Sequence, residues 1–390
     1  FLVTVNLINK SKVIKDEKIK PNDCLYQVGF KCEADSGEIK DYPNISTISY
    51  DEEEQDLTLQ YKDNIQYAIG HGCSATWDYD KNKKYFTQTT WIPQHTIKDF
   101  KFDIETKNDL NFLSLNFLAS KNTKKIDLIN GLNSFLKLYE IWFSNLKTQK
   151  VDSKFKETKS RIISKIEIAI NRIRDGINLL ANDNEVLSSF KLANEAMLRQ
   201  MIYSKISSNN NENSNEKIKP NFFSDDYKDL QWRPFQLAFQ LLVIESLVNK
   251  DSSYRDTVDL IWFPTGGGKT ESYLALAAFE LIYRRVKYKE QGFGTGVIKR
   301  YTLRLLAAQQ LQRAATLISA LELMRKEYID TLLSEPFTLG FWVGGATTPN
   351  RYNNPKKTIW QNDEGAKQRL DEALESEEPV NHFQLLNCPI

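Results

Sequence analysis

A glycine-rich loop with the sequence FPTGGGKT, at Phe263–Thr270, constrains this chain more than any other feature. The short apolar run Val258–Phe263 before the loop is typical of a buried parallel strand, and the residues from Lys269 onward predict a helix with one apolar face. When a strand is followed by a glycine turn and then a helix, backbone N–H groups of the turn point toward one place. The helix N-terminus adds positive potential there, so phosphate binds. The sequence therefore predicts a phosphate-binding loop.

The residue types in the loop favour a nucleoside triphosphate and Mg²⁺ as its ligands. A lysine at this position reaches the β- and γ-phosphates, and the following hydroxyl takes a Mg²⁺ position. We therefore expect Lys269 and Thr270 to be catalytic in ATP hydrolysis, with Thr270 as the Mg²⁺ ligand. The predicted nucleotide-binding residues of the loop are Thr265, Gly266, Gly267, Gly268, Lys269, Thr270 and Glu271.

The loop resembles motif I of superfamily-2 helicases. The general phosphate-loop pattern GxxxxGK[ST] has a glycine where this chain has Phe263, whereas the TGxGKT core is kept at Thr265–Thr270. A glycine turn ahead of an ordinary core helix is the alternative interpretation, and the strand–turn–helix order argues against it.

An R-x-x-Q element precedes the loop and resembles the helicase Q motif. A glutamine amide can pair with adenine N6 and N7, and an aromatic or guanidinium plane can stack on the base. Arg233, Phe235 and Gln236 are therefore the predicted adenine contacts. The alternative is a helix anchor, with Trp232 and Phe235 in the core and Gln236 in solvent.

A second motif follows the loop. Val297–Thr302 is typical of a strand, and the sequence TLRLLAAQQ that continues it into a helix resembles helicase motif Ia. The loop after a parallel strand lies at the edge of the sheet where ligands bind. We expect Thr302, Arg304 and Gln309 to contact a DNA phosphate, with Arg304 as the strongest candidate. Leu339–Val343 predicts a further strand.

The acidic metal and water site that a hydrolysing motor needs is expected outside this chain. The string Asp371–Leu374 lies in a charged stretch that predicts an exposed helix face. We therefore expect a fragment that is truncated before motif II and inactive alone, with the second motor lobe beyond Ile390. Cys388 is compatible with the start of a CPxC knuckle that holds Zn²⁺, although a buried free thiol is the default for one cysteine.

The predicted fold class is multidomain, α+β and α/β. It comprises a β-rich N-terminal domain (1–120), a helical bundle (121–206), a flexible linker (207–220) and a partial RecA-like P-loop lobe with a parallel sheet (221–390). The acidic run Asp51–Glu54 is interpreted as an exposed turn. The strands predicted in the N-terminal domain include Val3–Leu7, Leu25–Cys32, Leu57–Tyr61, Ala75–Tyr79 and Tyr85–Ile92.

Composition limits the function classes. The 390 residues carry a net charge of +1, so a DNA path would have to be a local basic stripe. The four cysteines have no framework spacing, which favours a reducing compartment. The chain has no apolar run of about 18 residues and no signal peptide, and it is therefore expected to be cytoplasmic with no membrane partner.

Several strings together resemble the family of helicase subunits of the DISARM anti-phage defence system: AIGHGCSATWD, FKLANEAMLRQ, WRPFQLAF, WFPTGGGKTESYLALAAF, RYTLRLLAAQQLQRA and WVGGATTPN. The resemblance implies an ATP-driven DNA helicase or translocase in host defence. It also implies a DUF1998-type, DrmB-like partner subunit, and DNA that is single-stranded or duplex with an overhang. A translocase that never separates strands and a nucleotide-gated binding scaffold without turnover remain as alternatives.

Overall fold

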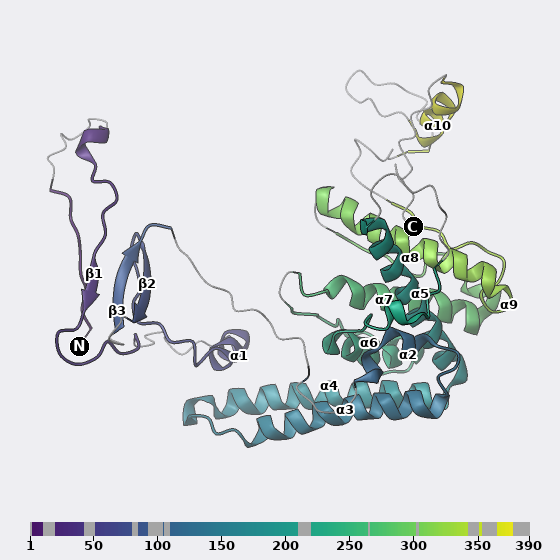
Figure 1. Ribbon diagram of the computed structural model, residues 1–390, viewed down its shortest axis with the longest axis horizontal. Coiled ribbons are helices and arrows are strands. Elements are labelled where there is room, and N and C mark those ends of the chain that lie inside the picture. Colours follow the sequence, from purple (N-terminus) through teal and green to yellow (C-terminus); the bar gives the residue numbers. More distant parts are fainter. Residues whose placement is uncertain are drawn as a thin grey trace. The chain divides into compact units, whose positions relative to one another are not determined.

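The computed structural model of the chain describes residues 2–10, 20–42, 51–79, 85–92, 104, 110–209, 220–263, 266–301, 304–341, 351–352 and 365–376. These residues divide into two compact units. The first comprises Phe1–Lys101 and Lys150–Ile163, and the second comprises Phe102–Gln149 and Ser164–Ile390 (Figure 1). Each unit is described by itself.

A small antiparallel sheet forms the ordered centre of the first unit. Its strands are β1 (Lys31–Glu33), β2 (Ser74–Tyr79) and β3 (Tyr85–Thr90), in the order β1-β3-β2. The ring of Tyr85, at the start of the central strand β3, stacks on the ring of Tyr67 with centroids 5.0 Å apart. The strands predicted at Ala75–Tyr79 and Tyr85–Ile92 are confirmed, whereas the described residues hold far less β structure than a β-rich domain would.

The predicted strand at Leu57–Tyr61 is wrong, because this segment belongs to helix α1 (Glu52–Gln60). The side chain of Asp51 accepts a hydrogen bond of 2.9 Å from the N–H of Glu53 and caps the helix. Three glutamates then occupy the first turn, where the helix dipole favours negative charge. The acidic run is therefore a helix start rather than a turn. Helix α1 is held to the start of α4, within the same unit, by an ion pair of 2.6 Å between Arg161 and Asp56.

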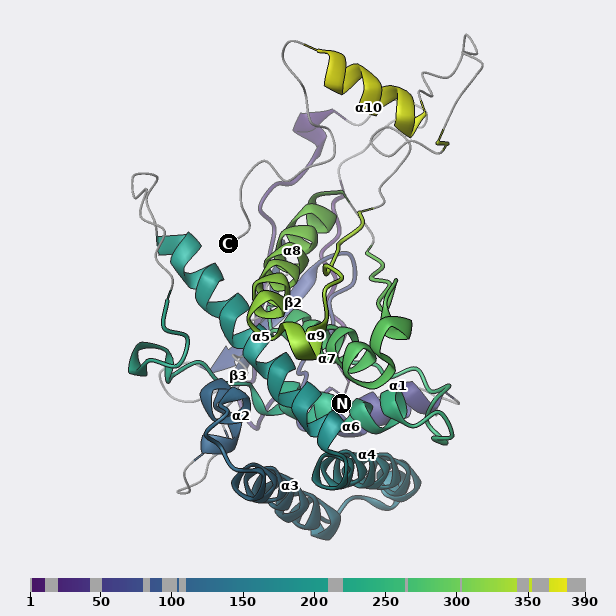
Figure 2. The ribbon, with the colours of Figure 1, turned by 90° about the vertical axis from the view of Figure 1, so that its right-hand side faces the viewer.

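The second unit is built around α5 (Asn184–Asn209). Helices α2 (Leu115–Ala119), α7 (Lys269–Tyr288) and α8 (Arg304–Glu327) all pack against α5, which crosses the centre of this unit in Figure 2. The buried side chains of α5 supply much of the core: Val186, Phe190, Ala193, Ala196, Met197, Leu198 and Ile202. The helix is buried around most of its circumference from Leu192 to Gln200, and polar residues such as Asn194 and Glu195 lie among its apolar ones.

Two long helices, α3 (Lys125–Thr148) and α4 (Lys156–Asn182), run side by side in both views (Figures 1 and 2). An ion pair of 2.7 Å between Arg174 and Glu140 links them. Together with α5 they confirm the helices that the apolar periodicity predicts between residues 121 and 206. Helix α5 extends to Asn209, and residues 210–219 of the predicted linker lie outside the described residues.

The remaining helices complete the unit. Helix α6 (Pro234–Val248) packs against α7, and α9 (Ile329–Leu332) packs against α7 and α8. The short 3-10 turns are η1 (Pro21–Asp23), η2 (Asn111–Leu113), η3 (Ser153–Phe155), η4 (Asp225–Tyr227) and η5 (Lys289–Gly292), of which η1 and η3 belong to the first unit. Over the described ranges, no helix combines the length and the apolar content that crossing a bilayer requires.

Helix α10 (Ala366–Glu375) contains the acidic string that the sequence places on an exposed helix face, and the structure confirms that assignment. Asp371 accepts a hydrogen bond of 2.8 Å from Lys367 one turn earlier, and Leu374 is 75% exposed. The string is therefore no acidic metal site.

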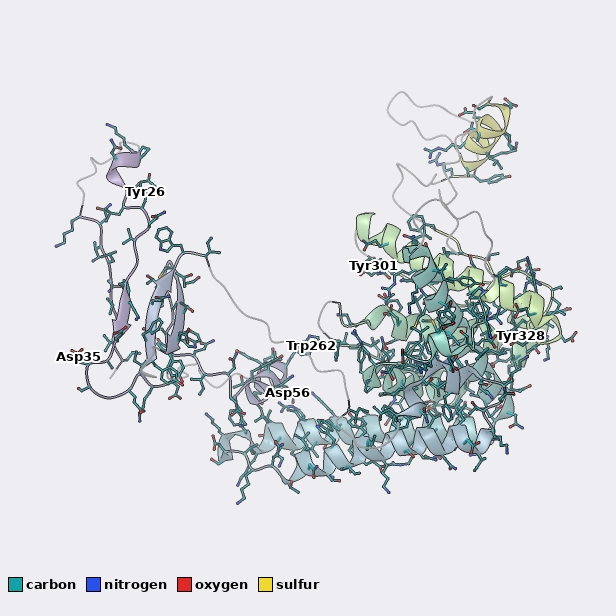
Figure 3. All side chains as sticks on the ribbon, in the orientation of Figure 1. Tyr26, Asp35, Asp56, Trp262, Tyr301 and Tyr328 are labelled. Carbon is teal, nitrogen blue, oxygen red and sulfur yellow. The ribbon has the colours of Figure 1, made fainter. Side chains whose placement is uncertain are left out.

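The parallel sheet predicted for the phosphate-loop lobe is not present among the described residues. The segments Val258–Phe263, Val297–Tyr301 and Leu339–Phe341 lie outside any strand. Val258 and Ile298, expected in a buried strand, are 91% and 89% exposed. Figure 3 labels Trp262 and Tyr301, two exposed aromatic side chains of these segments. Strand structure requires hydrogen-bonding neighbours on at least one side, and none is present for these segments in the described part of the chain.

We expect Gly176→Ala to lower the thermal unfolding temperature of the protein. A Cβ at position 176 would lie 2.0 Å from the carbonyl oxygen of Leu241, so α4 and α6 would have to separate. Overpacking of this kind costs about 1–3 kcal/mol, although the better helix propensity of alanine offsets about 1 kcal/mol. The exposed neighbour Asp175→Ala is the control and should change stability by less than about 0.5 kcal/mol. A Gly176→Ala protein as stable as the control would contradict the close packing.

Candidate nucleotide-binding site

The glycines of the phosphate loop have the backbone conformation that the prediction requires. Gly266 and Gly268 have φ angles of +80° and +87°, in the left-handed region that side-chain-bearing residues avoid. Gly268 is the N-cap residue of α7, and Lys269 is the first residue of that helix. A Cβ at Gly266 would have nothing within 4 Å, so the space beside the loop is open to a ligand.

Residues at the N-terminus of helix α6 bind the phosphate loop through hydrogen bonds. The Nε2 of Gln236 donates a hydrogen bond of 2.7 Å to the carbonyl of Gly268, and Arg233 Nη1 donates one of 2.5 Å to the carbonyl of Gly267. These side chains bind carbonyl groups of the loop, so they do not occupy its N–H groups. We call this set of contacts the α6 clamp.

The glutamine of the clamp is also fixed at its other end. Gln236 Oε1 accepts a hydrogen bond of 2.8 Å from the N–H of Arg233, which satisfies a free donor at the start of α6. Gln236 is 4% exposed, contrary to the alternative in which it is solvated. Among the described residues, this leaves one N–H and one lone pair of the amide available for a further hydrogen bond.

Trp232 anchors the clamp in the core. Its side chain is 1% exposed, and its indole N–H donates a hydrogen bond of 2.7 Å to Asn194 of α5. The backbone N–H of Trp232 also donates to the carbonyl of Leu113, at 2.8 Å. Arg233, immediately after Trp232, is therefore held at a fixed position.

Phe263 contacts both helix α6 and Lys269. Its ring stacks on Phe235 with centroids 4.2 Å apart and planes inclined by 15°. Its carbonyl accepts a hydrogen bond from Lys269 Nζ, so the ammonium folds back over the loop. In this position the ammonium lies beside the glycine turn, where it would meet a phosphate.

The segment before the loop is tethered to α4. Asp259 accepts two hydrogen bonds from Arg172, of 2.5 and 2.9 Å, and the guanidinium also lies 4.6 Å from the ring centre of Tyr254. The side chains of Arg172 and Asp259 are 7% and 18% exposed. Because the pair is largely buried, removing one partner would leave an uncompensated charge and cost about 3–5 kcal/mol.

The first turn of α7 contains Glu271, a predicted nucleotide-binding residue, and Ser272, which the sequence analysis did not single out. Glu271 forms an ion pair with Arg313 of α8, while its second carboxylate oxygen, Oε2, is buried without a hydrogen-bond partner among the described residues. Ser272 Oγ is also buried without a hydrogen-bond partner among the described residues. Buried polar atoms without partners are rare, and beside a phosphate loop they are suited to a ligand or its water.

A chain of hydrogen bonds leads from the loop to the segment before α8. Tyr273 Oη lies 3.0 Å from Thr270 Oγ1 and 3.2 Å from Gln310 Oε1, and Lys299 Nζ donates to the same Gln310 oxygen at 2.8 Å. Lys299 Nζ also lies 5.0 Å from the ring centre of Tyr273. We call these four residues the Thr270–Lys299 relay.

Partial burial sets the ionisation of two relay residues. Desolvation raises the pKa of Tyr273, against a smaller opposing effect of its hydrogen bond with Thr270, so the hydroxyl keeps its proton at neutral pH. Desolvation of the ammonium lowers the pKa of Lys299, although the residue as a whole is exposed.

The predicted DNA contacts are placed only in part. Thr302 lies outside the described residues, and Arg304 begins α8 with a side chain that also lies outside them. Gln309 is exposed on α8, whereas its neighbour Gln310 belongs to the relay. Sequence analysis missed Tyr273, Gln310 and Arg313. The i, i+3 spacing of Thr270 and Tyr273 was the one available signal.

Two other predicted residues are not described. Thr265 of the loop and Cys388, the candidate Zn²⁺ ligand, lie outside the described residues. Among those that are described, no cluster of at least three His, Cys, Asp or Glu side chains is arranged to hold a metal ion. Zn²⁺ binding at Cys388 therefore stays a prediction.

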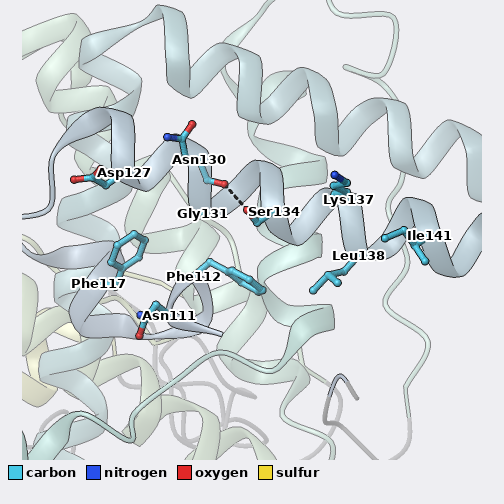
Figure 4. A pocket seen from close by; sticks show the side chains of 10 residues that line it. All are labelled: Asn111, Phe112, Phe117, Asp127, Asn130, Gly131, Ser134, Lys137, Leu138 and Ile141. Atoms are coloured by element: carbon cyan, nitrogen blue, oxygen red, sulfur yellow. Dashed lines mark hydrogen bonds between the residues drawn. The ribbon is translucent and has the colours of Figure 1, made fainter. Parts of the chain in front are cut away.

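A groove of about 590 Å³ is lined by η2, α2 and α3 (Figure 4). Its charged lining residues are Asp127 and Lys137, and Ser134 is already bonded to the carbonyl of Asn130 at 2.9 Å. The groove has no set of convergent polar groups comparable to those at the phosphate loop. The phosphate loop is therefore the better candidate site.

Comparison with known proteins yields one extended similarity. No protein-family model matches the chain. The whole chain is 32% identical, over 403 aligned residues, to the DISARM protein DrmA of Bacillus paralicheniformis, and it spans 34% of the length of that protein. The similarity covers the phosphate loop, the α6 clamp and the relay together. Along its full length, this chain is a DrmA-like protein.

Proposed function

We propose that this chain provides the nucleotide-binding part of an ATP-dependent DNA helicase or translocase that acts in bacterial anti-phage defence. The observation that carries the proposal is the glycine loop, with two left-handed glycines at a helix N-terminus and two carbonyls held by the α6 clamp. The relative with 32% identity, named as a DISARM protein, supports the role in defence.

The residues of the loop fit a nucleoside triphosphate and Mg²⁺. The open space beside Gly266 accommodates phosphate, and the N-terminus of α7 favours its charge. Lys269 would leave the carbonyl of Phe263 to pair with the β- and γ-phosphates, and the hydroxyl of Thr270 would hold Mg²⁺. Bound Mg²⁺ would neutralise charge that develops in phosphoryl transfer. Gln236 and Arg233 hold the carbonyls of the loop in place and would also contact the adenine base.

DNA is the proposed substrate of the movement. Arg304, Thr302 and Gln309 would bind backbone phosphate, which fixes position without reading sequence. A DUF1998-type, DrmB-like subunit is the proposed partner, and the cytoplasm is the proposed location. The four cysteines without framework spacing agree with a reducing compartment.

The first experiment measures the steady-state ATPase activity of the full-length protein with and without single-stranded DNA. We expect Lys269→Ala to lower DNA-stimulated turnover by about 10²-fold or more, because phosphoryl transfer depends on charge stabilisation. Lys287→Ala is the matched control: this lysine lies at the other end of α7 in an exposed ion pair with Glu185. ATP binding without turnover, with or without the partner subunit, would favour the scaffold alternative.

Substitution of Gln236 distinguishes adenine recognition from support of the loop. Gln236→Glu would place a carboxylate against the carbonyl of Gly268, and we expect the KM for ATP to rise by about tenfold, equivalent to about 1.4 kcal/mol. If Gln236 also contacts adenine, the preference for ATP over GTP falls with it. Equal weakening for both nucleotides would leave only the supporting role.

DNA binding is tested with Arg304→Ala by fluorescence anisotropy over a range of salt concentrations. Loss of one phosphate contact should weaken binding to all sequences alike and reduce the slope of log K against log salt by about 0.9 for duplex or 0.7 for single strands. Lys326→Ala, in the last turn of the same helix, is the control. An unchanged slope would remove Arg304 from the DNA path. Strand-displacement assays then separate a helicase from a translocase that leaves strands paired.

A further inference from the structure

The Thr270–Lys299 relay connects the proposed nucleotide site with the segment that leads to the proposed DNA contacts. Thr270 is the proposed Mg²⁺ ligand at the start of α7, and Lys299 lies in the exposed segment that leads to the proposed DNA contacts. Tyr273 and Gln310 fill the distance between them with hydrogen bonds of 3.0, 3.2 and 2.8 Å. None of these contacts is needed to build the phosphate loop itself.

We propose that the relay couples nucleotide binding at Thr270 to the binding of a nucleic-acid phosphate at Lys299. The inference rests on the proposed function, because it takes ATP and DNA as the two ligands. It assigns to Tyr273 and Gln310 the role of positioning residues, which touch neither ligand and make each site respond to the other.

The hydrogen bonds of Tyr273 can run in two directions. Its single proton is donated either to Thr270 Oγ1 or to Gln310 Oε1, and the two distances of 3.0 and 3.2 Å allow both. In the first arrangement, Thr270 uses a lone pair on the tyrosine. In the second, Thr270 donates its own proton to Tyr273, and its lone pairs are available for a cation.

Metal ligation at Thr270 therefore selects the second arrangement. When the hydroxyl oxygen turns its lone pairs toward Mg²⁺, its proton must point away, and Tyr273 Oη lies within reach to accept it. Tyr273 must then donate to Gln310.

Phosphate binding at Lys299 selects the same arrangement from the other end. Gln310 Oε1 is shared between Lys299 and Tyr273 in this structure. A phosphate that withdraws the ammonium removes one of the two donors, and the carbonyl becomes a better acceptor for Tyr273. The ammonium of Lys299, which precedes the exposed Arg300 and Tyr301 in the chain, is suited to such a phosphate.

Both ligands thus stabilise one hydrogen-bond direction, from Thr270 to Tyr273 to Gln310. Each ligand should therefore raise the affinity for the other by the same factor, as linkage requires. Couplings of this kind are typically between about 5-fold and 150-fold. A coupling of about tenfold is expected for this chain.

The test measures binding rather than turnover. In the full-length protein, the Kd of a non-hydrolysable ATP analogue with Mg²⁺ is determined with and without single-stranded DNA at fixed ionic strength, and the Kd of the DNA with and without the analogue. We expect Tyr273→Phe to reduce the coupling from about tenfold to less than about twofold, with the unfolding temperature nearly unchanged.

Gln310→Leu should remove the coupling to the same extent, and the double variant with Tyr273→Phe should show no further loss, because the two residues act in one chain. Tyr288→Phe, in the last turn of α7, is the matched control and should keep the wild-type coupling. Coupling that survives in Tyr273→Phe would overturn the inference, as would wild-type protein that binds both ligands independently. Wild-type protein that binds no nucleotide would overturn the proposed function as well, which separates the two failures.

Discussion

The covering of α5 on nearly every side is the constraint on which the rest of the second unit depends. From Leu192 to Gln200 its residues are all buried, so α2, α7 and α8 have to lie against it. The charged residues inside this core are paired with one another. Arg199 donates hydrogen bonds to Glu195, at 2.5 Å, and to Glu327 of α8, at 2.6 Å.

The same cluster extends to Tyr328, whose hydroxyl lies 2.9 Å from Glu195 Oε2. Buried charges are tolerated only where their partners satisfy them, and here three elements must meet for that to happen. The end of α8 is thereby fixed relative to α5. The start of α8, which carries Gln310, is consequently held against the N-terminal half of α7.

The sequence was sufficient for features that depend on local chemistry. The conformations of Gly266 and Gly268 follow from the pattern of a phosphate loop, and the helix after Lys269 follows from apolar periodicity. Non-local pairing was not predictable in the same way. The apolar runs before the loop and before α8 have strand composition, but a strand exists only with a neighbour, and composition does not supply one.

The incorrect or missed predictions for residues within helices also have physical causes. The segment Leu57–Tyr61 alternates like a strand, and the cap at Asp51 decides in favour of the helix. For Gln309 and Gln310 the sequence offers two identical side chains in succession, which a helix rotates by about 100° relative to each other. Only the packing of α8 on α7 determines that Gln310 faces Tyr273. Likewise, the role of Gln236 in supporting the loop depends on a contact across 32 residues.

The tether between Arg172 and Asp259 has a mechanical consequence for the phosphate loop. The five residues from Asp259 to Phe263 are held at one end by a nearly buried guanidinium and at the other by the ring of Phe235. A short segment that is held at both ends has little conformational freedom, so a displacement at one end is passed on to the other. A displacement of α4 at Arg172 would therefore act on Phe263, whose carbonyl accepts the hydrogen bond from Lys269.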